Sequence, residues 1–330
     1  MTAGSITLQP TFSFYVGPSD VALIAEVAAA ADAVTVVGKG GPDAIRTLRR
    51  QGFTATVLFD RAGYSANAGT VDIARWIDEQ TTAGADRVLT AGRLVSLRAG
   101  EPQAWRDDLA AELALAEEFE ATALVALDAR ILARHTTDLI ALLGEARRPV
   151  ALVLADRADP LALSGATDGL SRLVRATDQL SVLRADHGAV AVPAFGGAHA
   201  AFGLVASKRH YAMSAARAKR GNFARVFVPY YLDWFTADLI AGWAAAERAL
   251  RCDLPCCEGR TMDRFLDTRL QPREHNMRAI AAFADYVLTP DPVDRPRTFL
   301  DAVATAHSHY DIDGLVGPTS KAQLNAWALG

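Results

Sequence analysis

The sequence has little cysteine, no long uninterrupted apolar run and no excess of basic charge. Its 3 cysteines among 330 residues are too few and too crowded for the spread pairs of a disulfide framework. No window reaches the roughly 18 apolar residues that a membrane span needs, and the first residues lack the basic start and apolar run of a secretory signal. We therefore expect a soluble, cytoplasmic protein with no membrane segment.

The charge balance argues against one class of function. The formal net charge is −4 and the isoelectric point is near 6.0. Proteins that bind nucleic acid without sequence preference neutralise many phosphates with Lys and Arg. Bulk binding of polyanions is therefore not expected, although a local basic patch is compatible with this charge.

What the sequence has in quantity is apolar residues, which make up 51% of the chain. Short β-branched apolar runs alternate with segments of helical periodicity, which is typical of a parallel sheet with crossover helices. No G-x-G-x-x-G pattern opens the first unit, which disfavours a dinucleotide-binding doubly wound fold. The sequence predicts a (β/α)8 TIM-like barrel. The expected strands are 12–16, 33–37, 55–59, 87–90, 122–127, 149–155, 180–184 and 200–206, with a ninth candidate at 225–229.

The alternation stops after residue 230, and mainly helical segments follow. We therefore predict two parts, a barrel over residues 1–235 and a helical C-terminal subdomain over residues 236–330. The second part contains the three cysteines.

Carboxylates follow four of the predicted strands. They are Asp60, Asp128, Asp156 and Asp186. Catalytic groups of a parallel barrel lie at the C-terminal ends of its strands, and paired carboxylates can supply a nucleophile and a general acid/base at a glycosidic centre. Two alternatives stay open, because Asp is a frequent helix N-cap and the neighbouring arginines could form an ion-pair ring that only stabilises the barrel mouth.

Three cysteines and a histidine form a second candidate site. Cys252, Cys256 and Cys257 precede His275, and thiolates with an imidazole make a closed tetrahedral zinc site. The preferred ligands are Cys252, Cys257 and His275, with Cys256 as the fourth ligand or a bystander. The alternative is buried structural cysteines with a surface histidine.

Together these segments resemble the tRNA-guanine transglycosylase superfamily, whose members have an irregular barrel with a zinc-binding C-terminal insertion of pattern C-x-C-x-x-C followed by His. The segment 252–257 is similar to that pattern with Leu254 in place of the second cysteine. The family motif T-D-S-G-G-F-Q is similar to residues 59–65, and a later L-D strand end is similar to residues 127–128. The resemblance implies that Asp60 is a catalytic acid/base and that Asp128 reads the edge of the base.

Two further motifs depart from the family pattern. The family's nucleophilic Asp lies in F-D-C-V-L-P-T-R, and the matching residues 202–209 have Gly203 at that position. Asp186 or Asp156 would have to substitute for the family's Asp, and Asp186 is the candidate nucleophile. The V-Q-G-G segment that binds guanine in the family corresponds to residues 154–157, so Asp156 is expected to contact the base.

Substrate contacts are also expected from Tyr64, inside the first motif, and from Arg209. Arg209 belongs to a basic run interleaved with aromatics, a composition that can hold a phosphate backbone and stack bases, although a solvated helix face is an alternative. The basic residues of this run are His199, Lys208, Arg209, His210, Arg217, Lys219 and Arg220.

Two functions compete at this level, and a third interpretation is an unrelated metal-dependent barrel hydrolase. The first is a base-exchange or N-glycosidic-bond enzyme of the tRNA-guanine transglycosylase type, acting on a nucleobase in tRNA, DNA or a nucleoside, with structural zinc. The second is a non-catalytic paralogue that binds a nucleobase or nucleic acid, either as a homodimer or as the partner of another subunit.

Overall fold

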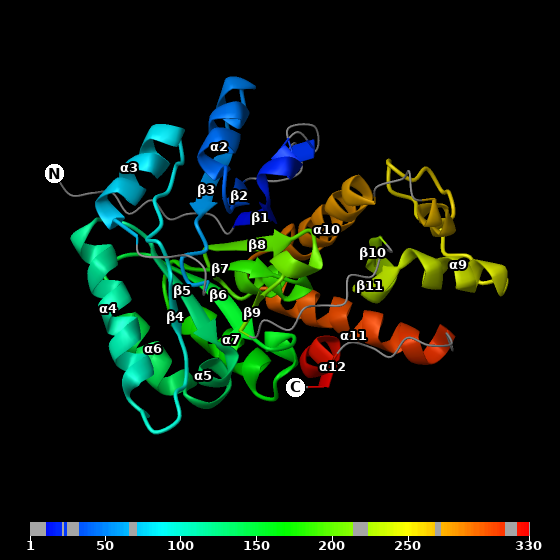
Figure 1. Cartoon of the computed structure of the whole chain (residues 1–330). Coiled ribbons are helices and arrows are strands. Elements are labelled where there is room, and N and C mark those ends of the chain that lie inside the picture. The colour runs from blue at the N-terminus through cyan, green and yellow to red at the C-terminus, as the bar shows by residue number, and fades with distance from the viewer. Residues whose placement is uncertain are drawn as a thin grey trace.

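The computed structural model describes residues 11–21, 23–24, 33–65, 71–213, 224–267, 272–313 and 322–329. Eight parallel strands form one curled sheet (Figure 1) in the order β3-β2-β1-β8-β7-β6-β5-β4. Their apolar side chains are buried along nearly every strand. The strands are β1 (Thr11–Val16), β2 (Ala33–Val37), β3 (Thr56–Asp60), β4 (Arg93–Val95), β5 (Ala123–Asp128), β6 (Val150–Asp156), β7 (Leu180–Ala185) and β8 (His199–Gly203).

The two ends of this sheet meet through the segment before β4. Leu58 of β3 forms a parallel bridge to Arg87, and Leu89 forms one to Thr122 at the start of β5. The Thr122 amide donates to the Val88 carbonyl at 2.9 Å. The sheet therefore closes on itself, and the predicted TIM-like barrel is confirmed.

The fourth predicted strand, 87–90, is wrong as a regular strand. The side-chain amide of Gln80 donates to the Leu89 carbonyl at 2.7 Å and accepts from the Leu89 amide at 3.0 Å. The Trp76 indole also donates to that carbonyl at 3.0 Å. Side chains of the preceding helix thus take the backbone groups that a strand ladder would use, and regular pairing starts only at Arg93.

The ninth predicted strand, 225–229, does not belong to the barrel. It is β10 (Arg225–Val228), which pairs antiparallel with β11 (Asp233–Thr236) in a separate two-stranded sheet. Pro229 ends β10 because proline has no backbone N–H to donate, and Leu232 turns the chain with φ of 45°. Since eight strands already close the barrel, no open edge is left for a ninth. A short strand, β9 (Tyr211–Ala212), pairs with the end of β6.

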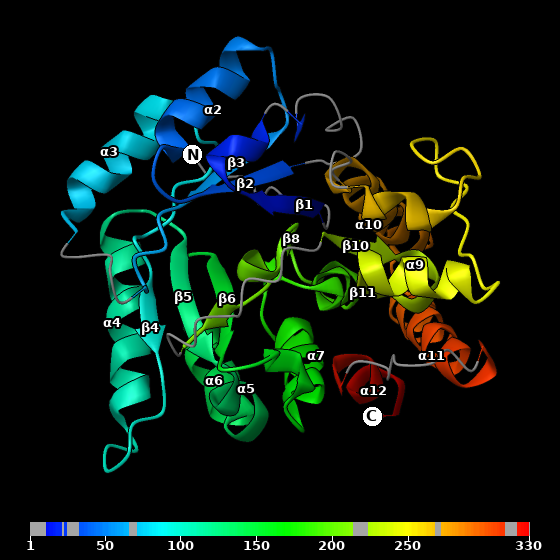
Figure 2. The ribbon, with the colours of Figure 1, turned by 45° about the vertical axis from the view of Figure 1, so that its right-hand side comes forward.

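Helices cover the outside of the barrel (Figure 2). They are α2 (Gly41–Arg50), α3 (Ile73–Ala83), α4 (Ala104–Glu118), α5 (Ala129–Arg134), α6 (Thr136–Gly144), α7 (Ala166–Ala176), α8 (Ala191–Ala194), α10 (Arg273–Leu288), α11 (Arg295–Asp313) and α12 (Ala322–Leu329). Helix α9 (Ala237–Ala245) packs in a separate core with β10 and β11. None of the described helices is long and apolar enough to cross a membrane.

Two separate hydrophobic cores divide the C-terminal part. Met277 and Phe283 of α10 and Phe299 of α11 belong to the same core as the barrel strands. A second core is formed by β10, β11, α9 and the cysteine turn, and includes Trp243 and Cys257. The cysteines thus lie on an insert between β8 and α10, seen beside α10 and α11 in Figure 1.

Side-chain alternation along the strands fixes what faces the inside of the barrel. Leu58, Leu124, Ala126, Ala151 and Val153 form the interior cluster. Successive strand residues point to opposite faces, so Asp60, two residues after Leu58, and Asp128, two after Ala126, point inward at the C-terminal end. Val150, Leu152 and Leu154 pack in the outer core instead, which puts Asp156 on the helix-facing side.

Candidate functional site

Asp60 is one of two strand-end carboxylates, with Asp128, that have no exposed surface. Its Oδ2 accepts the hydroxyls of Tyr15 at 2.6 Å and Tyr64 at 2.9 Å, and its Oδ1 accepts the Ala62 amide at 2.6 Å. Strand β1 and the loop after β3 therefore hold one carboxyl group at the centre of the barrel mouth.

Arg184 extends this network from the far side of the mouth. Its Nη1 donates to the Tyr64 hydroxyl at 3.2 Å and its Nη2 to the Ser207 carbonyl at 2.7 Å. It has a left-handed φ of 55° at a register shift between β7 and β8. Such a bulge re-aims a side chain, here across the mouth towards Tyr64.

Burial sets the protonation of the Asp60 network. Removal from water raises the pKa of Asp60, and this outweighs the hydrogen bonds from Tyr15, Ala62 and Tyr64 and the charge of Arg184, which lower it. Burial likewise raises the pKa of both tyrosine hydroxyls. The tyrosines therefore stay protonated donors, while Asp60 can carry a proton at a higher pH than an ordinary carboxyl group.

Asp128 has a local partner that satisfies its charge. Its carboxylate accepts Arg130 Nε at 3.0 Å and Nη2 at 2.5 Å, and also the Arg130 backbone amide at 2.9 Å as the N-cap of α5. The Leu97 amide donates to it at 3.3 Å. Asp128 is fully buried at the mouth. It points inward and also caps a helix, which is the alternative role considered for these carboxylates.

Asp156 is placed differently from the other three. It is partly exposed at the end of β6, and its Oδ1 accepts the Ala158 amide at 2.9 Å. Its carbonyl accepts the Met213 amide at 3.1 Å, which anchors β9 over this strand end. The structure does not bring Asp156 into the Asp60 network.

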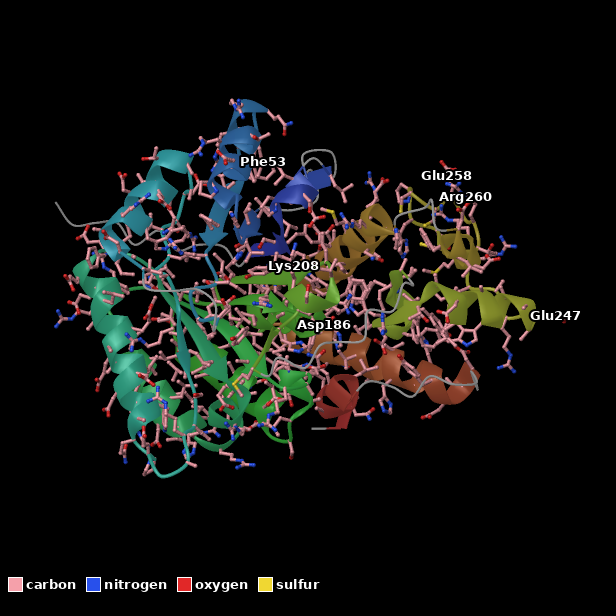
Figure 3. All side chains as sticks on the ribbon, in the orientation of Figure 1. Phe53, Asp186, Lys208, Glu247, Glu258 and Arg260 are labelled. Atoms are coloured by element: carbon pink, nitrogen blue, oxygen red, sulfur yellow. The ribbon has the colours of Figure 1, made fainter. Side chains whose placement is uncertain are left out.

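Asp186 lies just beyond β7, two residues after Arg184, in the centre of Figure 3. Its Oδ1 accepts the His187 amide and the Trp234 indole, both at 2.9 Å. The guanidinium of Arg209 stacks on Trp234, with Cζ 3.3 Å from the ring centroid. Burial lowers the pKa of Arg209 to about 10, and the charge of Asp186 opposes that shift. Asp186, Trp234 and Arg209 thus form a second cluster at the mouth.

The remaining residues of the basic run do not gather in one place. Lys208 donates to Asp20 at 3.2 Å, and Arg273 of α10 donates to the same carboxylate at 2.6 Å. His199 lies at the opposite end of β8, with Nδ1 2.8 Å from the Thr11 hydroxyl and Nε2 3.0 Å from that of Ser13. Arg217, Lys219 and Arg220 lie outside the described residues.

Gly203 occupies the position that the family motif gives to its nucleophile, and the fold leaves no room there for a side chain. A Cβ at Gly203 would lie 2.0 Å from the Lys208 carbonyl oxygen and 2.7 Å from the Arg209 nitrogen. The backbone after β8 folds directly over this residue. A carboxylate at position 203 would require that loop to move.

The Cys/His cluster is assembled on the insert. Cys252, Cys257 and His275 place their ligand atoms within 4.8 Å of one another, with His275 Nδ1 3.8 Å from Cys252 Sγ and 3.2 Å from Cys257 Sγ. Cys256 Sγ is 3.7 Å from Cys257 Sγ, although it lies outside the three-residue group. Zinc bonds of about 2.3 Å to sulfur and 2.0 Å to nitrogen make tetrahedral edges of roughly 3.5–3.8 Å, so these distances suit ligands of one ion.

The surroundings of the cluster also suit a metal. His275 Nε2 is 2.8 Å from the Phe227 carbonyl, an arrangement that leaves Nδ1 as the ligand. Burial raises the pKa of the Cys257 thiol, but contacts with His275, Arg264 and Cys252 outweigh it and bring the pKa to about 6. Metal ligation needs the thiolate, and the Arg264 guanidinium, with Nη2 3.0 Å from Cys257 Sγ, favours the negative charge.

One large cavity among the described residues lies away from the barrel mouth. It has a volume of about 1210 Å³ and lies between the insert and helices α10 and α11. Cys252 contributes to its wall, whereas none of the four strand-end carboxylates does.

Known proteins give few matches to this chain. No family model and no curated protein matches the sequence. Among solved structures, 3-keto-L-gulonate-6-phosphate decarboxylase from Vibrio cholerae is similar with 17% identity and a TM-score of 0.37, over 60% of this chain and 91% of that chain. A xylose isomerase-like TIM barrel/4-hydroxyphenylpyruvate dioxygenase fusion protein is similar with 14% identity and a TM-score of 0.41. That match covers 96% of this chain and 46% of the fusion protein.

Three residues of the mouth were not singled out from the sequence as site residues. Tyr15 and Arg184 complete the Asp60 network, and Trp234 joins Asp186 to Arg209. The sequence did contain an indication for Tyr15, because a tyrosine near the C-terminal end of a buried strand needs a hydrogen-bond partner for its hydroxyl. The sequence contained no such indication for Trp234, since its contact with Asp186 depends on how the insert folds back onto the barrel.

Proposed function

We propose that this chain is a base-exchange or N-glycosidic-bond enzyme of the tRNA-guanine transglycosylase type, acting on a nucleobase in a nucleic acid or nucleoside. One observation carries the proposal. Asp60, the residue that the motif resemblance assigns as acid/base, is buried at the C-terminal end of a barrel strand between two tyrosine hydroxyls. Its raised pKa suits a group that delivers a proton to a leaving base.

Asp186 is the proposed nucleophile. Its Oδ1 is held by the His187 amide and the Trp234 indole, which orients the carboxylate. In the proposed step a bond forms between this carboxylate and the anomeric carbon while the bond from that carbon to the base nitrogen breaks. The electron pair leaves with the base, which takes a proton from Asp60. An incoming base or water then attacks the anomeric carbon and gives its proton to Asp60, while the bond to Asp186 breaks and frees its carboxylate.

Substrate contacts are proposed for the surrounding side chains. Tyr64 lies against the Asp60 carboxyl, and Arg209 lies beside Asp186 on the face of Trp234. Asp128 points inward at the same mouth. Its carboxylate already binds Arg130, so a base edge would have to bind the same carboxylate together with Arg130. Asp156 has the least support because it lies on the helix-facing side of β6.

We also propose that zinc binds Cys252, Cys257 and His275, with Cys256 as the fourth ligand after a small movement. The tetrahedral spacing and the carbonyl partner of His275 support this assignment. Bound there, zinc would supply a structural crosslink between the cysteine turn and α10.

The second function, a non-catalytic paralogue that binds a nucleobase or nucleic acid, is favoured by Gly203. The side chain that the family uses for covalent chemistry is absent, and the backbone of Lys208 fills its place. If Asp186 does not replace it, the fold would bind without turnover.

The test is incorporation of radiolabelled guanine into unfractionated tRNA and into DNA, together with a denaturing gel that detects a covalent protein adduct. We expect exchange and an adduct with the parent protein, loss of both with Asp186→Asn, and loss of exchange by at least about a hundredfold with Asp60→Asn. Asp43→Asn, at an exposed position on α2, is the control. Unchanged exchange in both mouth variants would overturn the assignment, and saturable binding without exchange or adduct would favour the paralogue.

A further inference from the structure

The cavity of about 1210 Å³ beside the insert is somewhat larger than a typical small-molecule site and has both apolar and polar lining residues. Small-molecule sites measure roughly 300–1,000 Å³ and combine apolar walls with a few polar groups. Its lining includes the turn that carries Cys252 and part of α10. Backbone hydrogen bonds from Cys257 to Leu254 at 2.7 Å and from Gly259 to Cys252 at 3.0 Å hold this turn in shape.

Aromatic rings are left exposed in this cavity. Tyr286 on α10 is 60% exposed and Tyr230 is 46% exposed, and both line the cavity. Tyr230 is held flat by a parallel stack on His309, with ring centroids 3.6 Å apart and planes 3° apart. Phe283 and Tyr231 line the same space. A rigid exposed ring such as Tyr230 offers a stacking face at little cost in conformational entropy, and the exposed ring of Tyr286 offers a second face.

The formal charge of the cavity lining is balanced, and Arg251 is the group that can face an anion. Arg248 and Arg251 line it, opposed by Asp253 and Asp313. The Asp313 carboxylate already accepts the Tyr231 hydroxyl at 2.7 Å, which makes it part of the fold. Arg251 Nη1 donates to the Gly259 carbonyl at 3.0 Å. The planar guanidinium group has further N–H donors, in a geometry that suits phosphate.

We propose that this cavity binds a nucleotide, with its base stacked on Tyr286 and Tyr230 and its phosphate facing Arg251. The inference rests on the proposed function, in that it supplies a second contact for a nucleic-acid substrate away from the barrel mouth. The same chemistry would also accept a free mononucleotide. Aromatic faces beside cationic groups are the usual way in which proteins hold unpaired nucleotides.

The test is equilibrium binding of two probes to the full-length protein. Adenosine 5′-monophosphate is measured by calorimetry, and a fluorescein-labelled single-stranded oligothymidylate by anisotropy. Tyr286→Ala and Arg251→Gln are the cavity variants. Leu300→Ala and Arg297→Gln, at exposed positions of α11 outside the cavity lining, are the matched controls. Circular dichroism checks that each variant folds.

Loss of one stacked base contact should weaken binding by about fivefold to a hundredfold, and the controls should bind like the parent. An effect on the oligonucleotide alone assigns the cavity to a strand, whereas an equal effect on both probes assigns it to a mononucleotide. Unchanged affinity for both probes in both cavity variants would overturn the proposal.

The two proposals fail in distinguishable ways. Asp60→Asn and Asp186→Asn should leave probe binding at the cavity unchanged, because neither residue lines it. If base exchange is absent from the parent protein while the cavity variants still lose probe affinity, the proposed activity is wrong and the proposed nucleotide site is confirmed.

Discussion

The backbone of Lys208 lies where the side chain of residue 203 would project, with its carbonyl oxygen 2.0 Å from the position of a Cβ at Gly203. Lys208 is held there from the other side, since its ammonium group donates to the buried Asp20 at 3.2 Å. The loop after β8 is therefore tied to the turn after β1, and Gly203 lets this loop cross the end of β8.

Gly203→Ala should therefore destabilise the protein. The added methyl group meets backbone rather than a flexible side chain, and overpacking of this kind costs typically about 1–3 kcal/mol. Urea unfolding measures the change. Gly242→Ala in α9, where a Cβ meets nothing within 4 Å, is the control and should gain up to about 1 kcal/mol from helix propensity. An alanine at 203 that unfolds like the parent would show that the loop moves freely.

His199 should make the protein acid-sensitive. Burial, helped by the charge of Arg87, lowers its pKa to about 3, so the folded protein holds it neutral between Thr11 and Ser13. Because the unfolded chain binds a proton at about pH 6.5, stability is complete above that pH and is lost as pH falls towards 3, by as much as roughly 5 kcal/mol.

Urea unfolding between pH 4 and pH 7.5 tests this dependence. His199→Gln should flatten the slope of unfolding free energy against pH over this range. His135→Gln, at a partly exposed position, should keep the slope of the parent. Equal slopes in all three proteins would place the origin of acid sensitivity elsewhere.

Metal removal should loosen the insert before the barrel. We expect one zinc per chain by elemental analysis of the purified protein, and Cys257→Ala should abolish it because Cys257 is the buried thiol closest to His275. Chelation should lower Tm and expose the 251–261 turn to limited proteolysis. Cys256→Ala should retain more zinc than Cys257→Ala. A parent protein that carries no zinc, or a Cys257→Ala protein that keeps it, would contradict the site.

The sequence determined the barrel. Apolar runs buried on both faces and alternating with amphipathic helices leave few other folds, and the bounds of β1, β2 and β5 fall within one residue of those predicted. It also placed Asp60 and Asp128 at strand ends and brought the cysteines and His275 into one candidate cluster, because those inferences depend only on order along the chain.

Tertiary structure decided the remainder. The residues of segment 87–90 by themselves are compatible with a strand. The segment is irregular because the side chain of Gln80, in a neighbouring helix, hydrogen-bonds to the backbone of Leu89. The Asp60 network likewise joins Tyr15, Tyr64 and Arg184 from three separate strand ends. Contacts between residues far apart in sequence depend on the register of the barrel strands and on the paths of the loops. Periodicity and composition do not predict either of these.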